Sequence, residues 1–311
     1  MNGEALRVDR RGFLKFAAAL AGNCWLWPGG LNASTSRSIK KAVPSTGEMI
    51  PVIGMGTSRT FDAVNEPERL KALALVLEAF FQHGGTVIDS SPIYGSSEQV
   101  IGMLLQRVKR PDSLFAATKV WTDGRVSGER QMERSLQLWG VERFDLMQIH
   151  NLRDWQVHLE TLKEMKAQGR IRYLGITTSH GRSHTELESV LDRQPFDFVQ
   201  LTYNIENREA ERVLLPLALE RGIGVIVNRP FARGALFNKT RDKPLPVWAS
   251  QIGCRSWGQF LLKYAVSHPA VSCAIPATSK TRHMLDNMGA GYGVLPDSKM
   301  RERMQGYLAA L

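Results

Sequence analysis

Four polar residues stand at or just beyond the ends of short apolar runs, and together their side chains could carry out acid–base chemistry. They are Asp89, Tyr94, Lys119 and His150. A free phenol has a pKa of about 10 and is a weak acid at neutral pH, so we expect the Lys119 ammonium to lower the pKa of Tyr94. A carboxylate would keep the lysine charged, and an imidazole would orient a carbonyl oxygen beside the phenol. This set predicts protonation of an alkoxide as it forms during hydride addition to a carbonyl.

Each of these residues alone also has a purely structural explanation. Asp89 would cap a helix, Lys119 would be a solvated charge, His150 a hydrogen-bonded core histidine and Tyr94 a packing residue. The functional interpretation therefore depends on the four side chains meeting. No cysteine lies near them in the sequence, and the seven histidines show no HExxH-type pairing. We expect neither thiol catalysis nor a metal site.

The elements that must bring these residues together follow a repeating pattern from residue 50 onward. Short apolar runs rich in β-branched residues predict strands that are buried on both faces of a parallel sheet. Between them, amphipathic stretches followed shortly by glycine predict helices. The expected strands cover residues 52–56, 86–89, 114–119, 144–150, 173–177, 198–201, 224–227 and 271–275, and the clearest helices cover 68–83, 129–139, 159–168 and 209–220.

Eight strands with intervening helices favour an α/β fold, a (β/α)8 TIM barrel, whose chemistry lies at the C-terminal ends of the strands. Asp89, Lys119 and His150 would then reach one rim from three consecutive strands. Residues 39–52 predict an N-terminal β-hairpin ahead of the barrel, and residues 232–248 predict a long loop after the seventh strand. An open doubly wound sheet is the alternative, but no GxGxxG motif follows the first strand.

Over residues 39–290 the chain resembles the aldo-keto reductase family. The resemblance rests on Gly-Met-Gly-Thr at 54–57, on Val-Ile-Asp-Ser-Ser-Pro-Ile-Tyr-Gly at 87–95 followed by Ser97 and Glu98, and on the lysine and histidine motifs at 117–119 and 148–150. It implies an NADP(H)-dependent reductase with Tyr94 as general acid or base, Lys119 and Asp89 as the groups that tune it, and His150 as the residue that orients the carbonyl.

The resemblance also implies a set of cofactor contacts. Thr178 stands where the family usually has asparagine, and Asn228 replaces the aromatic residue that stacks on the nicotinamide. Hydroxyls and cations at 278–282 suit a 2′-phosphate and favour NADP, with NAD as the alternative, although an ordinary basic helix start would look similar. The expected contacts are Gly56, Thr57, Thr177, Thr178, Gln200, Asn228, Pro230, Ala232, Gly234, Thr278, Lys280, Arg282, His283 and Asn287.

The first 33 residues have the layout of an export signal, with a charged start, a short apolar run and small residues near position 33. Arg10 and Arg11, followed by Gly-Phe-Leu-Lys, resemble a twin-arginine translocation (Tat) signal. We therefore expect a signal peptide over 1–33, a barrel domain over 34–311, passage through the Tat translocon and a periplasmic location. A basic tail or a short surface helix is the structural alternative, and an uncleaved signal would instead anchor the chain to the membrane.

Composition excludes several other functions. Of the formal net charge of +10, half lies in the first 41 residues, and no aromatic-basic repeat or helix-turn-helix pattern follows, so no nucleic-acid partner is expected. Three cysteines are too few for a disulfide framework. No stable membrane span is expected after cleavage, because no run reaches 18 apolar residues.

The sequence thus predicts an oxidoreductase that transfers a hydride between NADP(H) and a small-molecule carbonyl or alcohol, whether aldehyde, ketone or sugar. A cofactor-binding regulatory module with low turnover is the alternative, supported by Asn228. Four aromatic residues are candidate walls of the substrate pocket, with packing beneath the loops as the alternative, namely Trp121, Trp155, Phe231 and Trp248.

Overall fold

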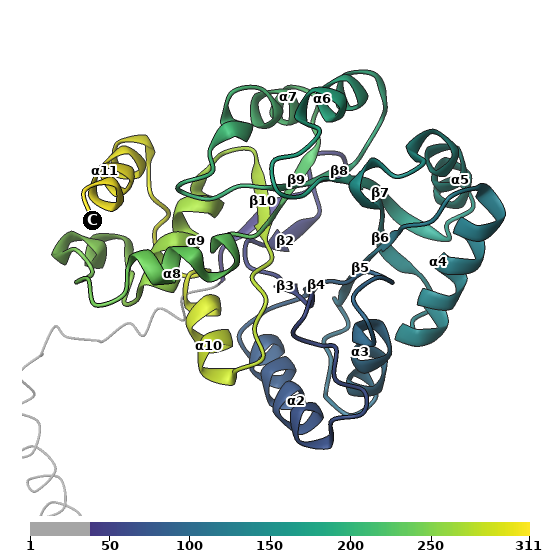
Figure 1. Cartoon of the computed structure of the whole chain (residues 1–311), viewed down its shortest axis with the longest axis horizontal. Coiled ribbons are helices and arrows are strands. Elements are labelled where there is room, and N and C mark those ends of the chain that lie inside the picture. The colour runs from purple at the N-terminus through teal and green to yellow at the C-terminus, as the bar shows by residue number, and fades with distance from the viewer. Residues whose placement is uncertain (1–37) are drawn as a thin grey trace, which may run out of the picture. The chain divides into compact units, whose positions relative to one another are not determined.

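Eight parallel strands form the centre of the structure, a computed structural model that describes residues 38–311. Each strand pairs with its neighbour along the chain, from β3 to β10, as expected for a (β/α)8 barrel (Figure 1). The twin-arginine segment predicted over residues 1–33 lies outside the described residues. The strands are β3 (Met55–Gly56), β4 (Val87–Asp89), β5 (Phe115–Val120), β6 (Phe144–Ile149), β7 (Ile171–Thr177), β8 (Phe198–Thr202), β9 (Gly224–Asn228) and β10 (Val271–Ala274).

The barrel closes where the segment around β3 meets the segment around β10, a junction we call the seam. Gly54 N–H donates to the Ala274 carbonyl at 2.9 Å, and Gly56 N–H donates to the Pro276 carbonyl at 3.1 Å. A Cβ atom at Gly56 would lie 2.8 Å from the Ile275 carbonyl oxygen. The glycines of the Gly-Met-Gly motif are therefore needed because two backbones approach closely there.

Helices cover the outside of the barrel. They are α2 (Pro67–Gln82), α3 (Ser97–Leu105), α4 (Arg125–Trp139), α5 (Trp155–Ala167), α6 (His184–Arg193), α7 (Leu214–Glu220), α9 (Trp257–Ser267), α10 (Thr281–Gly289) and α11 (Ser298–Ala309). Within residues 38–311 none of them has the length and apolarity that crossing a membrane would take.

Two details of the predicted elements are wrong. The helix expected over 209–220 is divided into a 3-10 turn, η2 (Glu209–Glu211), and α7, because Val213 between them has non-helical dihedral angles (φ −139°, ψ −54°). The long loop expected over 232–248 contains η3 (Ala232–Gly234), α8 (Ala235–Lys239) and the start of η4 (Val247–Ile252). Helical turns this short do not contain enough repeats of the apolar pattern to be recognised as helices in a sequence.

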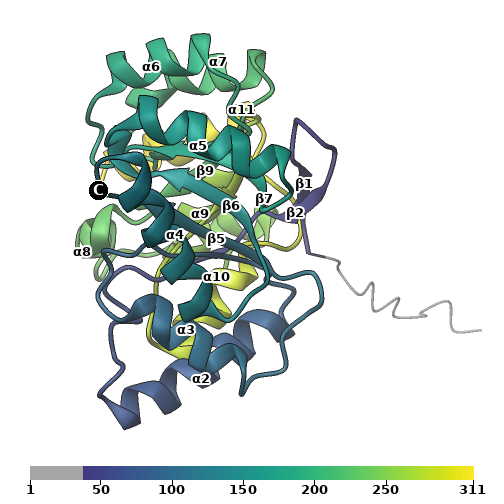
Figure 2. The same cartoon turned by 90° about the vertical axis from the view of Figure 1, so that its right-hand side faces the viewer.

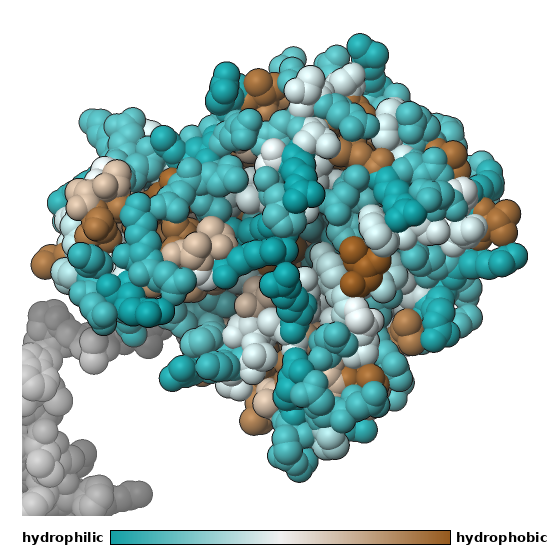
Figure 3. All heavy atoms as spheres, in the orientation of Figure 1, coloured by the Kyte–Doolittle hydropathy of each residue, from teal (hydrophilic) through white to brown (hydrophobic). Residues whose placement is uncertain are grey.

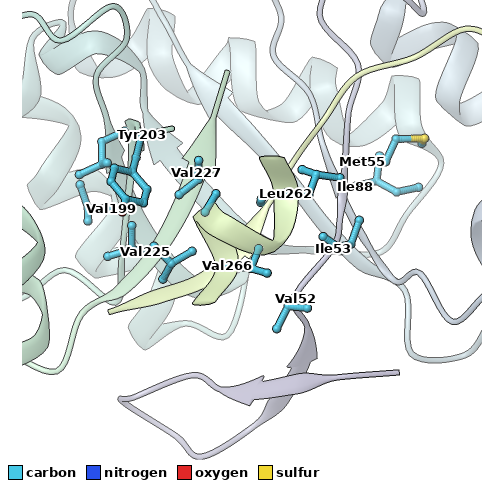
Figure 4. Packing of buried hydrophobic residues seen from close by; sticks show 14 of the residues in the cluster. Val52, Ile53, Met55, Ile88, Val199, Tyr203, Val225, Val227, Leu262 and Val266 are labelled. Atoms are coloured by element: carbon cyan, nitrogen blue, oxygen red, sulfur yellow. The ribbon is translucent and has the colours of Figure 1, made fainter. Parts of the chain in front are cut away.

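Two apolar clusters hold the barrel together. The outer cluster lies between strands and helices, and Figure 4 shows part of it, including Leu262 and Val266 of α9 with Val227 of β9. The inner cluster fills the barrel with alternate strand residues, among them Val87, Phe115, Leu146, Tyr173 and Phe198. Alternate side chains along a strand point to the same face. The next inward-facing positions toward the C-terminal ends of the strands are therefore polar, namely Asp89, Lys119, Gln148 and Gln200.

The predicted N-terminal hairpin is present and closes the other end of the barrel. It consists of β1 (Lys40–Ala42) and β2 (Met49–Pro51), paired antiparallel. Val43 and Ile50 belong to the inner apolar cluster. Figure 2 shows the hairpin and α8 at opposite ends of the barrel. The C-terminal rim is thus the open end, the one that faces the viewer in Figure 1.

Candidate active site

Asp89 is the centre of a buried polar network inside the C-terminal end of the barrel. Its Oδ1 accepts from Lys119 Nζ at 2.5 Å, and its Oδ2 accepts from Gln148 Nε2 at 2.8 Å and from Gln200 Nε2 at 2.9 Å. Lys119 Nζ also donates to the Ser90 carbonyl at 2.6 Å. Three neighbouring strands and β8 therefore fix one carboxylate and one ammonium in a single geometry.

Lys119 remains charged although its side chain is fully buried. Burial alone would lower the pKa of this ammonium, but the Asp89 carboxylate and the Tyr94 phenol outweigh it and raise the pKa of Lys119 above its ordinary value. Lys119 Nζ lies 5.2 Å from the centre of the Tyr94 ring. A permanent positive charge thus stands next to the phenol.

Tyr94 is held by the loop between β4 and α3. Its carbonyl accepts from Ser97 Oγ at 2.7 Å, and the next residue, Gly95, adopts a positive φ of 62°. A Cβ atom at Gly95 would collide with the Asp62 carboxylate, which accepts from the backbone N–H of Ser96 at 2.8 Å. The Tyr-Gly pair of the sequence motif therefore places the phenol at the rim.

The Lys119 charge does act to lower the pKa of Tyr94, as expected, but the net pKa lies above the ordinary value of a phenol. Burial raises the pKa of the phenol, and the opposing effect of Lys119 does not cancel it. The prediction considered the neighbouring charge and could not weigh the loss of water around the hydroxyl. Tyr94 is accordingly a protonated phenol at neutral pH, ready to donate, and Lys119 stabilises the phenolate that donation would leave.

His150 lies beside Tyr94 and is a neutral imidazole. Its ring meets the Tyr94 ring edge-on, with the centroids 6.0 Å apart. Burial, with a contribution from the Lys119 charge, lowers the pKa of His150 to about 3. Its Nδ1 lies 3.0 Å from Ser91 Oγ. When the Ser91 hydroxyl donates to Nδ1, the proton of the neutral ring is on Nε2, where it can donate to a substrate oxygen.

A cavity of about 560 Å³ opens above these residues, and Figure 3 shows hydrophilic side chains around a hollow on this face. Asp89, Tyr94 and His150 line the cavity, whereas Lys119 lies beneath it. The predicted cofactor residues that also line it are Gly56, Thr57, Thr177, Thr178, Gln200, Asn228, Pro230 and Gly234.

The remaining predicted cofactor residues do not line this cavity. Ala232 lines a neighbouring hollow between the loops that follow β8 and β9. The cavity wall reaches Ala277, and the chain then enters α10. The other predicted residues stand just before α10 or within it, and none of them lines the cavity. They are Thr278, Lys280, Arg282, His283 and Asn287.

Of the aromatic residues predicted to wall the pocket, Phe231 lines the cavity. The three tryptophans do not line it, and the alternative, packing beneath the loops, holds for them. The Trp121 ring lies under the Arg153 guanidinium at 4.4 Å, Trp155 packs against the outer apolar cluster, and Trp248 packs against Phe260 and Tyr307.

Two polar atoms in the cavity wall suit a nicotinamide carboxamide. Thr178 Oγ1 is buried and has no hydrogen-bond partner among the described residues. Gln200 uses its Nε2 group for Asp89 and for Gln148 Oε1, which leaves its carbonyl oxygen for an amide N–H. Asn228, by contrast, donates to the Thr178 carbonyl at 3.0 Å and accepts from Thr202 Oγ1 at 2.6 Å, so its amide is already engaged by the protein.

Sequence reasoning missed Ser91, Gln148 and a group of arginines at the rim. Ser91 and Gln148 stand inside the motifs that carried the resemblance, and the alternation of strand side chains would have placed Gln148 beside Asp89. The hydrogen bond of Ser91 to His150 depends on a loop conformation that has no local pattern.

The chain is similar to known proteins over most of its length. The model of the family described as "Aldo/keto reductase family" matches residues 52–305. The chain is 28% identical over 286 residues to L-galactose dehydrogenase from Arabidopsis thaliana, covering 80% of this chain and 87% of that protein. It is 24% identical over 276 residues to aldo-keto reductase str7 from Strobilurus tenacellus, covering 76% and 80%.

Solved structures share the fold. An aldo/keto reductase from Klebsiella pneumoniae in complex with NADP and acetate superposes with a TM-score of 0.72 at 23% identity, covering 87% of this chain and 96% of that one. The glycerol dehydrogenase from Gluconobacter oxydans superposes with a TM-score of 0.73 at 20% identity, covering 87% and 95%.

Proposed function

This chain belongs to the aldo/keto reductase family, and from that premise we propose that its C-terminal rim catalyses NADP(H)-dependent interconversion of a carbonyl compound and its alcohol. The observation that carries this activity is the meeting of Asp89, Tyr94, Lys119 and His150 at one cavity. The Klebsiella pneumoniae relative was solved with NADP, which supports the choice of cofactor.

Each residue of the site has a distinct task in carbonyl reduction. The Tyr94 hydroxyl and the His150 Nε2–H group donate hydrogen bonds to the carbonyl oxygen, and the Tyr94 proton moves to that oxygen as it becomes an alkoxide. Lys119 stabilises the resulting phenolate, and Asp89 holds Lys119 in place. NADP(H), when bound, would provide the hydride chemistry in both directions. Thr178 and Gln200 would hold its carboxamide.

The 2′-phosphate of NADP would be held at the start of α10. Thr278, Lys280 and Arg282 offer a hydroxyl and two cations there, the groups that a phosphate monoester requires. The backbone N–H of Lys280 already donates to Thr278 Oγ1 at 3.1 Å, which orders this turn before a ligand arrives.

Replacing Tyr94 by phenylalanine tests the mechanism. We expect NADPH oxidation with a panel of aldehydes to fall by about 10²–10⁴-fold, while NADPH binding, followed by fluorescence, is retained. Turnover at the wild-type rate would refute the role of Tyr94. Single-turnover hydride transfer in the wild-type protein separates this enzyme from a regulatory module, which would bind NADPH and transfer little hydride.

We also propose that the chain is exported by the Tat translocon and acts in the periplasm. The support is the sequence of residues 1–33, with Arg10-Arg11 ahead of a short apolar run. Tat export carries folded proteins, so the cofactor would be loaded before export and retained tightly. An uncleaved signal that anchors the protein to the membrane is the alternative.

Cell fractionation of the full chain tests this location. Arg10→Lys with Arg11→Lys should leave the protein in the cytoplasm, whereas Arg7→Lys, outside the pair, should not. A periplasmic protein purified without nucleotide and with only micromolar affinity for it would contradict the proposed retention.

A further inference from the structure

The cavity is lined by more positive charge than the reaction requires. Arg59 reaches it from the loop after β3, and Arg229 and Arg233 reach it from the loop after β9. His180, after β7, also lines the cavity, but burial and the charges of Arg229, Arg233 and Arg182 lower its pKa, so it adds no positive charge at neutral pH. The only carboxylate among the described lining residues is Asp89, and that group is already bound to Lys119. The rim of the cavity therefore carries cations without a matching anion.

These cations are close enough to repel one another. Burial lowers the pKa of Arg229 to about 10, and the charges of Arg233, Arg182 and Arg59 contribute in the same direction. Among residues 38–311, the guanidinium groups of Arg59, Arg229 and Arg233 form no ion pair and no hydrogen bond, although the Arg229 backbone carbonyl accepts from Asn204 Nδ2 at 3.2 Å. The same three residues have positive φ angles, 64°, 53° and 56°. That backbone region is unfavourable for arginine, and strain of this kind gathers at ligand sites.

Arg229 also lies near the reacting group, and Arg59 lines the same cavity. The charge of Arg229 acts on the pKa of Tyr94, and the charge of Arg59 acts on that of Arg229, so the three groups form a connected set. Arg59 is not among the residues expected to hold the cofactor, whereas Arg229 stands between two of them, Asn228 and Pro230. An anion bound between them would lie in the same cavity as the phenol that protonates the carbonyl oxygen.

Building on the proposed carbonyl reduction, we propose that Arg59 and Arg229 form an anion subsite for the substrate, so that the preferred substrate is an aldehyde or ketone that carries a carboxylate or phosphate group. Guanidinium groups match the geometry of both anions. In the reaction the carbonyl carbon gains the hydride, the oxygen gains the Tyr94 proton, and the anionic group is unchanged.

Two matched aldehydes test the subsite, namely 4-formylbenzoate and its neutral methyl ester. The variant is Arg59→Asn, because asparagine tolerates the positive φ at this position, and the control is Arg134→Gln, an exposed arginine on α4. We expect the wild-type protein to favour the acid in kcat/KM. Arg59→Asn should lower the ratio of acid to ester about tenfold, and the control should leave it unchanged. A wild-type preference for the ester would overturn the subsite.

Cofactor phosphates are the other anions that these arginines could bind. If Arg59→Asn weakens NADPH binding and lowers kcat/KM equally for the acid and the ester, the arginines serve the cofactor and the substrate subsite is wrong. Unchanged NADPH affinity with a changed ratio supports it.

Calorimetric binding of terephthalate and benzoate to the NADP⁺ complex gives a readout that does not depend on turnover. A preference for terephthalate that Arg59→Asn removes would support the subsite even if no aldehyde were reduced, in which case only the proposed function would fail. Equal binding of both acids to the wild-type complex would overturn the subsite.

Discussion

The buried pair of Asp89 and Lys119 allows stability and catalysis to be separated by mutation. Asp89→Asn replaces a carboxylate that accepts three side-chain hydrogen bonds by an amide with a single acceptor oxygen. At the observed 2.5 Å separation, the attraction of the pair is about 7 kcal/mol for an effective dielectric constant of about 20. The desolvation of both ions offsets much of it. The variant leaves Lys119 buried without its partner, for which the expected loss is about 3–5 kcal/mol.

The assay is urea unfolding followed by tryptophan fluorescence, together with single-turnover hydride transfer. Asp89→Asn should lower the unfolding midpoint with an unchanged slope. Adding Lys119→Met removes the unpaired charge, so the double variant should be more stable than the sum of the two single effects implies. Its hydride transfer should remain slow, because the phenolate of Tyr94 has lost its ammonium.

Two results would refute this reasoning. One is a wild-type unfolding midpoint for Asp89→Asn, and the other is a double variant whose loss equals the sum of the single losses. Asp123→Asn is the matched control. Asp123 pairs with Arg153 at 2.6 Å on the surface, where water screens the pair, and its replacement should barely move the midpoint.

Three further predictions follow from the site and its supports. Ser91→Ala removes the hydrogen bond to His150 Nδ1 and should lower kcat about tenfold with little change in Tm. Ser91→Thr should restore part of the lost kcat. Wild-type kinetics in the alanine variant would exclude the positioning role of Ser91. Because the pKa of His150 is about 3 in the folded state and about 6.5 in the unfolded chain, only the unfolded chain takes up this proton between those values. Stability should therefore fall as the pH drops below about 6.5, and the difference between the urea midpoints at pH 7 and 5 should be smaller in His150→Gln than in the wild type. Part of the difference should remain, because burial also lowers the pKa of His268 to about 4. Gly102→Ala should destabilise by about 1–3 kcal/mol, because its Cβ would collide with the Leu138 carbonyl of α4, whereas Gly306→Ala in α11 meets no atom and should be neutral or stabilising; equal urea midpoints would contradict this.

Much of the fold and the central site could be predicted because both depend on regular periods. Buried strands with β-branched residues, separated by helical stretches that end at glycine, indicated the barrel. Consecutive strand ends placed Asp89, Lys119 and His150 at one rim, where the structure has them. The hairpin was recognisable from the turn residues between its two short strands.

The rest depended on burial and on contacts between distant segments. The raised pKa of Tyr94 follows from lost hydration, which the sequence does not record. Arg59 is far in the sequence from Arg229 and Arg233. The three arginines line one cavity only because the loops after β3 and β9 both reach its rim. The helix near Val213 is divided because one residue has non-helical dihedral angles. A pattern of apolar residues does not reveal a change at one residue.

The seam affects when the barrel can fold during synthesis of the chain. It joins the first barrel strand to the last, so nearly the whole barrel must be synthesised before the ring can close, and closure carries the loop entropy of that long separation. Such long-range pairing slows folding. Until β10 arrives, β3 and β9 are exposed edges with unpaired N–H and C=O groups, a form prone to associate with other chains. A chain that ends before Val271 would therefore be an open sheet with exposed edge strands that tends to aggregate.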